Sequence, residues 1–359
     1  MRVVASVLAV GLAVSACGEP PPEEQDAGGE GGKEFVGCMV TDQGGPDDKS
    51  FNETSYKGLQ DAEKDGAISE VKIAESNADS DYKPNVEEMV AGDCGMIVTV
   101  GFLLAEATQA AAEANPEEKF AIVDFLYTDP DTFEPVEIDN VKPLVFNTHE
   151  AAFLAGYLAA GQSETGKVAT WGGLKIPTVT IFMDGFADGV AHYNKEKDKD
   201  VEVLGWDKKS QDGQFVGDFS NSNKAKQISD NLLSAGADII MPVAGPIGEQ
   251  AAVAAKDAGD ASVIWVDTDG YESLTKYQDV ILTSVEKGMD VAVQEATTAA
   301  AEDSFSNEPF VGTLENEGVS ISPYHDFEDK VDDGLKQEVE DLKQQIIDGE
   351  LKVESDAAF

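Results

Sequence analysis

From residue 35 onward, short apolar runs alternate with longer segments whose apolar residues recur at helical spacing. This alternation predicts βαβ units, and therefore an α/β fold with parallel sheets covered by helices on both faces. The expected strands are residues 35–41, 71–74, 95–100, 120–125, 167–171, 201–204, 238–243, 262–266 and 280–283. The expected helices are residues 53–64, 103–114, 151–160, 179–195, 223–234, 247–257 and 332–348.

There are too many expected strands for one sheet of ordinary size, which predicts two lobes. Each lobe would hold a mostly parallel sheet flanked by helices. We expect an N-terminal lobe of residues 35–147 and 270–307, and a C-terminal lobe of residues 148–269 and 308–353.

The first residues have the pattern of a secretion signal. A basic residue precedes an apolar run at residues 3–14, which is too short to span a bilayer. The tetrad Val14-Ser15-Ala16-Cys17 resembles a bacterial lipobox, so we expect residues 1–16 to be removed and Cys17 to carry a lipid. Residues 17–34 are rich in Gly, Pro and Glu and are expected to form an acidic tether. An ordinary signal peptide or a buried apolar helix is the alternative.

The charge balance narrows the possible partners. The chain has 25 basic and 70 acidic residues, a net charge of −45. Such a chain repels nucleic acid and anionic membrane surfaces, so we expect no nucleic-acid partner. We interpret the acidity as a solvated surface suited to a salty medium. The alternative is a surface that attracts cationic partners.

Two further cysteines, Cys38 and Cys94, lie in or just before apolar strand-like runs. Outside the cytoplasm such residues can pair, and adjacent parallel strands would bring them together near their starts. We predict a disulfide with a structural role. Two buried free thiols are the alternative.

Candidate functional residues follow the apolar runs. Open parallel sheets bind ligands at the carboxyl ends of their strands, so these positions are the candidates for a site. The ten candidate residues are Asp42, Phe51, Asn52, Asp124, Phe219, Val243, Gly245, Asp267, Asp269 and Lys287.

The segment Thr41-Asp42-x-Gly-Gly-x-Asp-Asp-Lys-Ser-Phe51-Asn52 resembles the opening signature of the basic membrane protein family, the purine-nucleoside receptor lipoproteins. That family is similar in fold to type I periplasmic binding proteins, and its members hand nucleosides to an ABC permease. Trp265, Pro46 and Pro246 depart from the expected pattern. The agreement continues through residues 150–156, 185–189, 244–245, 266–269, 283–287 and 347–353.

The resemblance implies how a purine base would be held. Asp42 and Asn52 would contact the base or its surroundings. Phe51 and Phe219 would stack on its two faces, since aromatic rings supply large contact areas at low entropic cost. Asp124 would accept hydrogen bonds from the purine N–H groups. Without the resemblance, both phenylalanines would be interpreted as packing residues.

The resemblance also implies how the ribose would be held. Asp267 with Lys287 would bind the hydroxyl groups, because one carboxylate accepts two hydroxyl hydrogens at once. Asp269 is the alternative to Asp267, and Val243 and Gly245 would offer backbone groups. Carboxylates in the site would repel phosphates, which favours a nucleoside over a nucleotide.

Other local patterns have plainer interpretations. Ser50-x-x-Glu53 has the spacing of a capping box that starts a helix, and Asp48 is expected to help cap it. The three tryptophans are predicted to serve in packing: Trp171, Trp206 and Trp265.

Together these patterns predict a monomeric, lipid-anchored, extracytoplasmic substrate-binding component of an ABC importer whose two lobes close over a purine nucleoside. We expect no cofactor, no metal and no catalytic residue. The main alternative is a nucleoside or glycoside hydrolase that uses paired carboxylates. A nucleophile elbow, a P-loop and a zinc-protease motif are absent from the sequence, which argues against an enzyme. A receptor for a sugar or an autoinducer, and a surface antigen, are further alternatives.

Overall fold

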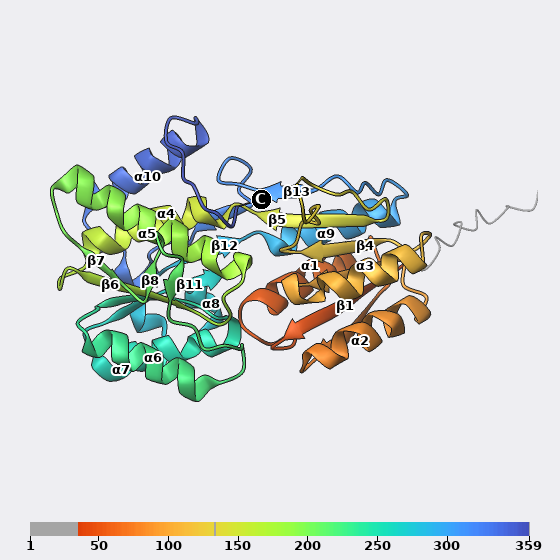
Figure 1. Ribbon diagram of the computed structural model, residues 1–359, viewed down its shortest axis with the longest axis horizontal. Helices are drawn as coiled ribbons and strands as arrows, with labels where there is room; N and C mark the ends of the chain where they lie inside the picture. The colour runs from red at the N-terminus through yellow and green to blue at the C-terminus, as the bar shows by residue number, and fades with distance from the viewer. Residues whose placement is uncertain (1–34, 133, 359) are drawn as a thin grey trace, which may run out of the picture. The chain divides into compact units, whose positions relative to one another are not determined.

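Two six-stranded sheets, each with helices on both faces, organise the protein in a computed structural model that describes residues 35–132 and 134–358 (Figure 1). The expected signal peptide, Cys17 and the tether lie outside these residues. None of the helices within the described ranges combines the length and the apolar character needed to cross a bilayer.

The first sheet has the strand order β13-β5-β4-β3-β1-β2, and all its pairings are parallel. Its two central strands, β3 and β4, are buried along their whole length, as expected for a sheet covered on both faces. The strands are β1 (Val36–Gln43), β2 (Glu70–Ser76), β3 (Met96–Val100), β4 (Phe120–Val123), β5 (Val141–Phe146) and β13 (Phe310–Gly312). The helices around it are α1 (Phe51–Lys64), α2 (Asp79–Ala91), α3 (Ala105–Ala114) and α9 (Met289–Ala301).

The second sheet has the order β14-β12-β11-β10-β6-β7, with only β14 antiparallel to its neighbour. Its strands are β6 (Lys167–Gly172), β7 (Glu202–Leu204), β10 (Ile239–Val243), β11 (Ser262–Asp267), β12 (Ile281–Lys287) and β14 (Val319–Ile321), with a separate hairpin of β8 (Trp206–Asp207) and β9 (Asp212–Gly213). The main helices are α4 (Thr148–Gln162), α5 (Pro177–Lys197), α6 (Ser222–Ser234), α7 (Glu249–Ala258) and α10 (Asp333–Ile347). Short helical turns are η1 (Phe102–Leu104), η2 (Gly245–Gly248), α8 (Gly270–Ser273), η3 (Gln278–Val280) and η4 (His325–Phe327).

The predicted fold class is confirmed, but some elements were not predicted. Strand β5 was missed because Lys142 and Pro143 interrupt its apolar run. Helix α9 was missed because its buried face is built largely from small residues rather than from a clear large-apolar stripe. The short strands β13 and β14, the β8–β9 hairpin and helix α2 were also missed.

The strand pairings differ from the expected lobe boundaries in two places. Strand β12 pairs with β11 in the second sheet, whereas residues 270–307 were assigned to the N-terminal lobe. Strand β13 pairs with β5 in the first sheet, although residues 308–353 were assigned to the C-terminal lobe. The chain therefore returns to the first sheet only after Lys287, at α9, which packs on α1. Apolar runs show that strands exist, but not which sheet each one joins.

Close helix packing accounts for two of the glycine motifs. Helices α4 and α5 make the most extensive helix pair of the described residues. A Cβ added at Gly156 would lie 2.1 Å from the carbonyl oxygen of Phe186, and one at Gly189 would lie 2.0 Å from that of Phe153. The two backbones thus approach so closely that only glycine fits, which gives residues 150–156 and 185–189 a structural role.

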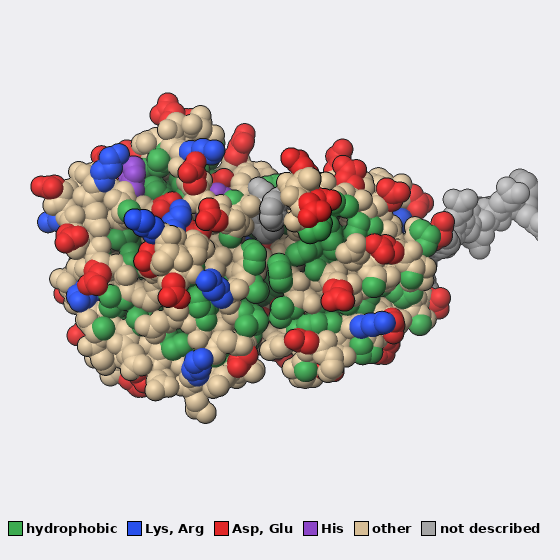
Figure 2. Space-filling model, viewed as in Figure 1, with side chains coloured by type: hydrophobic (Ala, Val, Ile, Leu, Met, Phe, Trp, Pro, Cys, Tyr) green, Lys and Arg blue, Asp and Glu red, His purple; other side chains and the backbone are tan. Residues whose placement is uncertain are grey.

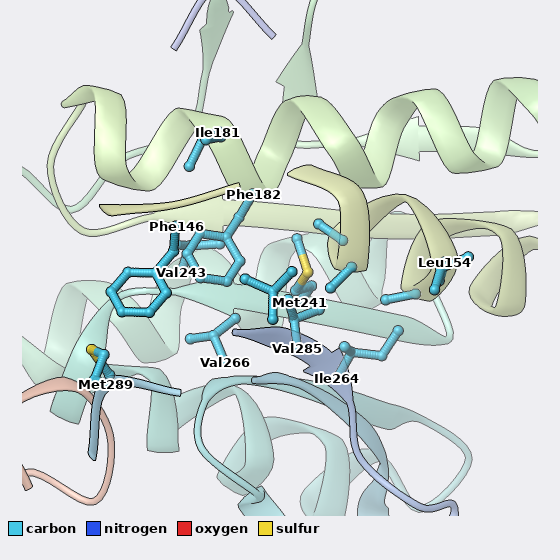
Figure 3. Close-up of a cluster of buried hydrophobic side chains, with 14 of the residues drawn as sticks. Phe146, Leu154, Ile181, Phe182, Met241, Val243, Ile264, Val266, Val285 and Met289 are labelled. Atoms are coloured by element: carbon cyan, nitrogen blue, oxygen red, sulfur yellow. The ribbon is translucent and has the colours of Figure 1, made fainter. Parts of the chain in front are cut away.

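The largest hydrophobic cluster extends from the first sheet and helices α1 and α9 to the second sheet and helices α4 and α5. Figure 3 shows Phe182 of α5 above Met241 and Val243 of β10, with Phe146 of the first sheet beside them. Because Phe146 and Met289 come from β5 and α9, this cluster reaches the point where the chain passes between the sheets.

Cys38 and Cys94 form the predicted disulfide, with Cα atoms 5.8 Å apart. Cys38 lies in β1, and Cys94 precedes β3, which pairs with β1. The disulfide therefore joins the first sheet to the loop between α2 and β3.

Candidate ligand-binding site

A cavity opens where the carboxyl ends of strands from both sheets meet. It encloses about 540 Å³ of space free of protein atoms, part of it open to solvent. The lining residues are Asp42, Gln43, Asp48, Phe51, Asn52, Gly101, Phe102, Leu103, Asp124, Ile176, Thr178, Val179, Phe182, Phe219, Val243, Ala244, Gly245, Pro246, Asp267 and Lys287.

Nine of the ten candidate residues from the sequence line this one cavity. They come from segments far apart in the chain, which only the folded topology brings together. The nine are Asp42, Phe51, Asn52, Asp124, Phe219, Val243, Gly245, Asp267 and Lys287.

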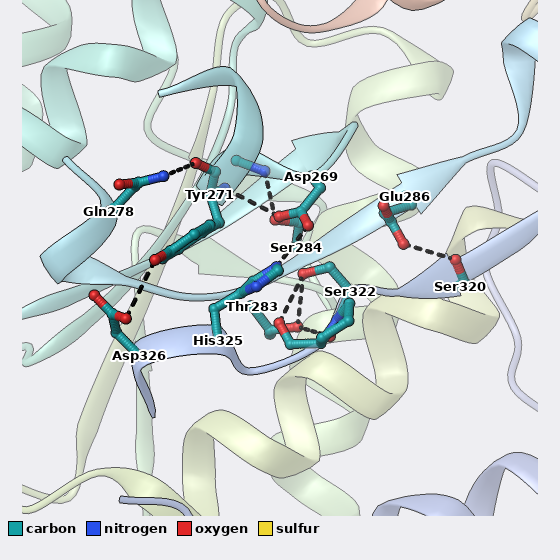
Figure 4. A network of polar contacts seen from close by, with 12 residues as sticks. Asp269, Tyr271, Gln278, Thr283, Ser284, Glu286, Ser320, Ser322, His325 and Asp326 are labelled. Carbon is teal, nitrogen blue, oxygen red and sulfur yellow. Dashed lines mark hydrogen bonds and ion pairs between the residues drawn. The ribbon is translucent and has the colours of Figure 1, made fainter. Parts of the chain in front are cut away.

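The tenth candidate, Asp269, has a different environment. Its side chain accepts a hydrogen bond from the backbone N–H of Tyr271 and thereby caps α8. Its Oδ2 also lies 2.6 Å from Nε2 of His325, whose ring stacks on Tyr271 (Figure 4). Asp269 is therefore absent from the cavity lining, and of the two alternatives only Asp267 faces the ligand space.

Lys287 is the one basic residue in the cavity lining, and it is only 4% exposed. Its Nζ lies 2.5 Å from Oδ2 of Asp124 and 3.3 Å from Oδ1 of Asp267. Burial alone would lower the pKa of Lys287, but the two carboxylates more than offset this effect and raise the pKa above its ordinary value. The ammonium group thus stays charged and connects β4 of the first sheet to β11 of the second.

The two carboxylates around Lys287 share an uncommon backbone conformation. Asp124 has φ +61° and Asp267 has φ +73°, both in the left-handed region that non-glycine residues rarely occupy. Each lies at or just after the end of its strand. Strained conformations of this kind persist only where the surroundings impose them, and they cluster at functional sites.

A second polar group lies at the end of β1. Asn52 donates hydrogen bonds from Nδ2 to Asp42 (2.9 Å) and to Asp48 (3.0 Å). Burial raises the pKa of Asp42 to about 8, although the bond from Asn52 opposes the change and nearby carboxylates add to it. Asp42 is therefore largely protonated at neutral pH. Asn52 Oδ1 is buried and has no hydrogen-bond partner among the described residues.

The predicted capping box at the start of α1 is wrong. Ser50 makes no side-chain capping bond to the helix. Instead Asp48 accepts hydrogen bonds from the backbone N–H groups of Asn52 and Glu53, at 2.9 and 3.0 Å. Ser50 donates its hydroxyl hydrogen to Asp267 Oδ2 of the second sheet, 2.7 Å away. Asp48 is therefore the residue that caps the helix. Its carboxylate also accepts hydrogen bonds from the backbone N–H of Ser50 and from the side-chain amide of Asn52.

Aromatic and aliphatic side chains form the rest of the wall. Phe51 and Phe219 both line the cavity, as predicted, and Lys287 Nζ lies 4.7 Å from the centre of the Phe51 ring. Phe102 and Phe182 line it too and were not predicted. Phe102 follows a strand end, which is a signal that could have identified it. Phe182 lies inside α5, where an apolar residue looks like any other core position.

The two sheets, the crossings between them and a cavity at their strand ends define a two-lobed periplasmic-type binding protein. The family of PnrA-like substrate-binding proteins of ABC transporters matches residues 35–357. The chain belongs to this family. It is therefore a substrate-binding component of an ABC transporter and not an enzyme, which confirms the predicted family and class.

Curated relatives span nearly the whole chain. A CD4+ T-cell-stimulating antigen of Listeria monocytogenes is 32% identical, covering 97% of this chain and 96% of the relative. The ABC transporter nucleoside-binding protein BmpA of Lactococcus lactis is 29% identical, covering 92% of this chain and 93% of the relative.

Solved structures share the fold. A solute-binding protein of an ABC transporter system from Aeropyrum pernix K1 superposes with a TM-score of 0.78 at 24% identity, covering 89% of this chain and 92% of that one. One from Conexibacter woesei gives a TM-score of 0.64 at 17% identity, covering 89% and 99%. The type I fold is thus confirmed.

Proposed function

We propose that this protein captures a nucleoside, and specifically a purine nucleoside, in the cavity between its lobes and presents it to the permease of an ABC importer. The observation that carries the proposal is the convergence of nine predicted residues on one cavity. The nucleoside-binding name of the Lactococcus lactis relative supports it. Closure would follow from a ligand that contacts both lobes and so favours the closed state.

The wall near β1 suits a purine base. Phe51 and Phe219 line the cavity, and their rings would stack on the base. Asn52 Oδ1 is an acceptor without a partner among the described residues, and a base N–H would satisfy it. Asp42, protonated because of its raised pKa of about 8, can donate a hydrogen bond to a ring nitrogen. A base that presents both a donor and an acceptor along one edge matches this pair.

The group around Lys287 suits the ribose. Asp267 keeps acceptor capacity beyond its contacts with Ser50 and Lys287, because a carboxylate has about four lone-pair sites. Lys287 can donate a further hydrogen bond beyond those to Asp124 and Asp267. A diol both accepts from the ammonium group and donates to the carboxylate. Lys287 contacts Oδ2 of Asp124, so a hydrogen bond from a base N–H to Asp124 would use Oδ1.

The experiment begins with identification of whatever ligand co-purifies with the protein, by mass spectrometry after denaturation. Calorimetry then compares guanosine, inosine, adenosine, cytidine and guanosine 5′-monophosphate. We expect purine nucleosides to bind, and the monophosphate to bind at least about tenfold more weakly because the carboxylates repel it. Preferential binding of a sugar would contradict the ligand class. Release of free base from a labelled nucleoside would contradict the receptor function.

We also propose that the mature chain is anchored by a lipid on Cys17, since the tetrad at residues 14–17 resembles a lipobox. In a bacterial host, wild-type protein should partition into the detergent phase of a Triton X-114 extract. Cys17→Ser should move it to the aqueous phase, whereas Ser6→Ala, within the same apolar run, should leave partitioning unchanged. Equal partitioning of the Cys17→Ser protein would contradict the anchor.

A further inference from the structure

One loop, residues 44–50, joins β1 to α1 and makes several contacts with the second lobe. Lys49 Nζ lies 3.2 Å from Glu249 Oε2 of the second lobe, and Ser50 Oγ lies 2.7 Å from Asp267 Oδ2. A third contact comes from Trp265 of β11, whose Nε1 donates to the backbone carbonyl oxygen of Lys49 at 3.3 Å. We call this segment the 44–50 loop.

These contacts differ in how well water competes with them. The side chains of Lys49 and Glu249 are 42% and 26% exposed, so their ion pair contributes little. Trp265 is 0% exposed, and its indole N–H would lose its partner if the loop moved away. An unmatched buried donor is costlier than a lost surface contact. The indole hydrogen bond therefore outweighs the surface ion pair.

The surroundings of Trp265 hold its ring in place. A Cβ added at Gly270 would lie 2.5 Å from Cβ of Trp265, and one added at Gly248 would lie 3.0 Å from the ring. Two glycines thus leave the space that the indole fills. The loop on the other side is equally constrained, since Lys49 has φ +60°, a conformation that persists only when its surroundings hold it.

A separate observation places the second lobe against the same loop. A Cβ added at Gly44, where φ is +131°, would lie 3.3 Å from Cγ of Pro246. Pro246 lines the cavity, and it and Trp265 are the two residues of the second lobe that depart from the sequence pattern expected above. Both departures therefore meet one loop of the first lobe.

We propose that Trp265 is a positioning residue: its indole N–H holds the 44–50 loop against the second lobe and thereby keeps Ser50 on Asp267 and Phe51 over the cavity. The hydrogen bond from the indole N–H to the loop, rather than the packing of the ring, positions the loop. Its effect on nucleoside retention rests on the proposed function, but its effect on the loop does not.

The test is Trp265→Phe, which removes the N–H and keeps an aromatic ring. Trp171→Phe is the matched control, because Trp171 is also 0% exposed in the second sheet and its Nε1 has no hydrogen-bond partner among the described residues. Both variants lose the same volume from the same hydrophobic cluster, so a shared effect reports packing.

Hydrogen–deuterium exchange of the nucleoside-free protein is measured first, over peptides that cover residues 46–54. We expect about 2- to 12-fold faster exchange in Trp265→Phe than in Trp171→Phe, the range of one net hydrogen bond. Equal exchange in the two variants would overturn the proposal, whatever the protein binds.

Stopped-flow dissociation of guanosine and inosine is measured next. We expect Trp265→Phe to release either nucleoside about 2- to 12-fold faster than Trp171→Phe. Equal release rates would overturn the role in retention. If the wild-type protein bound neither nucleoside, the proposed function would fail, and the exchange result would still decide the role of Trp265 at the loop.

Discussion

At the scale of single residues, the charge of Lys287 stabilises the buried carboxylates of the cavity. Two buried carboxylates, Asp124 and Asp267, share this one ammonium group. Removing one partner of a buried ion pair leaves uncompensated charge in a medium that solvates it poorly. The free energy of unfolding should therefore depend more on Lys287 than on any surface lysine.

Lys287→Met tests this dependence. We expect the variant to lose about 3–5 kcal/mol of unfolding free energy at neutral pH, measured by urea denaturation. The loss should shrink at low pH, because burial raises the pKa of Asp124, and the protonated Asp124 then needs no counter-charge. Lys57→Met is the control: this lysine pairs with Asp61 and Asp290 at the surface and should cost less than about 1 kcal/mol. Equal losses in the two variants would argue against a buried charged triad.

Asp42 makes the stability of the protein depend on pH in a particular direction. Burial raises the pKa of Asp42 from 3.8 to about 8. The folded protein then binds this proton more tightly than the unfolded chain, so stability is fully present below about pH 4 and is lost as pH rises toward 8. Asp48, with a pKa raised to about 6, adds to the same trend over a narrower range.

Asp42→Asn removes this titration. We expect the unfolding free energy of the variant, measured by urea denaturation at pH 4.5, 6 and 7.5, to fall less steeply with pH than that of the wild type. The exposed neighbour Asp47 supplies the control variant Asp47→Asn, which should keep the wild-type slope. Parallel curves for Asp42→Asn and wild type would show that Asp42 is ionised throughout this range.

At the scale of elements, the start of α1 depends on Asp48. The carboxylate accepts two backbone N–H groups of the first helical turn, so Asp48→Ala should cost about 0.5–2 kcal/mol of unfolding free energy. Ser50→Ala should not loosen the helix, because its hydroxyl bonds to Asp267 instead. Hydrogen exchange of the first turn of α1 separates the two: we expect faster exchange only in Asp48→Ala. Faster exchange in Ser50→Ala than in Asp48→Ala would instead show that Ser50 caps the helix.

The α4–α5 pair makes a second element-scale prediction. Gly189→Ala should destabilise the protein by several kcal/mol, on the order of 3, because the added methyl group meets the backbone of Phe153. Gly288→Ala is the control, since an added Cβ there meets nothing closer than 3.6 Å. Thermal unfolding of both variants tests the difference. A Gly189→Ala protein as stable as Gly288→Ala would mean that the two helices can separate at little cost.

The elements found from the sequence were those with strong patterns. Strands β3, β4 and β10 and the first five residues of β1 are nearly continuous apolar runs, and the amphipathic α6 and α10 show clear helical spacing. The elements missed had weak patterns, such as β13 and β14, which are three residues each and partly exposed. Their pairing partners, rather than their own residues, make them strands.

At the scale of the whole molecule, the cavity was more predictable than the lobe boundaries. Strand ends are visible in the sequence, and the rule that ligands bind there located Asp42, Asp124 and Asp267 without knowledge of which sheet each strand joins. Sheet membership depends on long-range packing, which is why β12 was placed in the wrong lobe. The contact of Ser50 with Asp267 depends on the spatial relation of the two lobes and leaves no local signal.

The net charge of −45 acts on the molecule as a whole. On the face of the molecule drawn in Figure 2, acidic side chains are spread over both lobes, and fewer basic side chains lie among them. Repulsion among like charges opposes the compact state, and salt screens it, with a Debye length of about 10 Å at 0.1 M and about 3 Å at 1 M. Added salt should therefore stabilise the folded protein.

Urea denaturation at 0.1 M and 2 M sodium chloride measures this effect. We expect the unfolding midpoint to rise with salt, and to rise similarly in potassium chloride, because screening depends on ionic strength and not on the cation. A response to one cation alone would instead indicate specific binding to the acidic surface. The buried triad of Lys287, Asp124 and Asp267 is shielded from solvent ions, so Lys287→Met should lose about as much stability in 2 M salt as in 0.1 M. That contrast separates the repulsion of the surface from the attraction within the cavity.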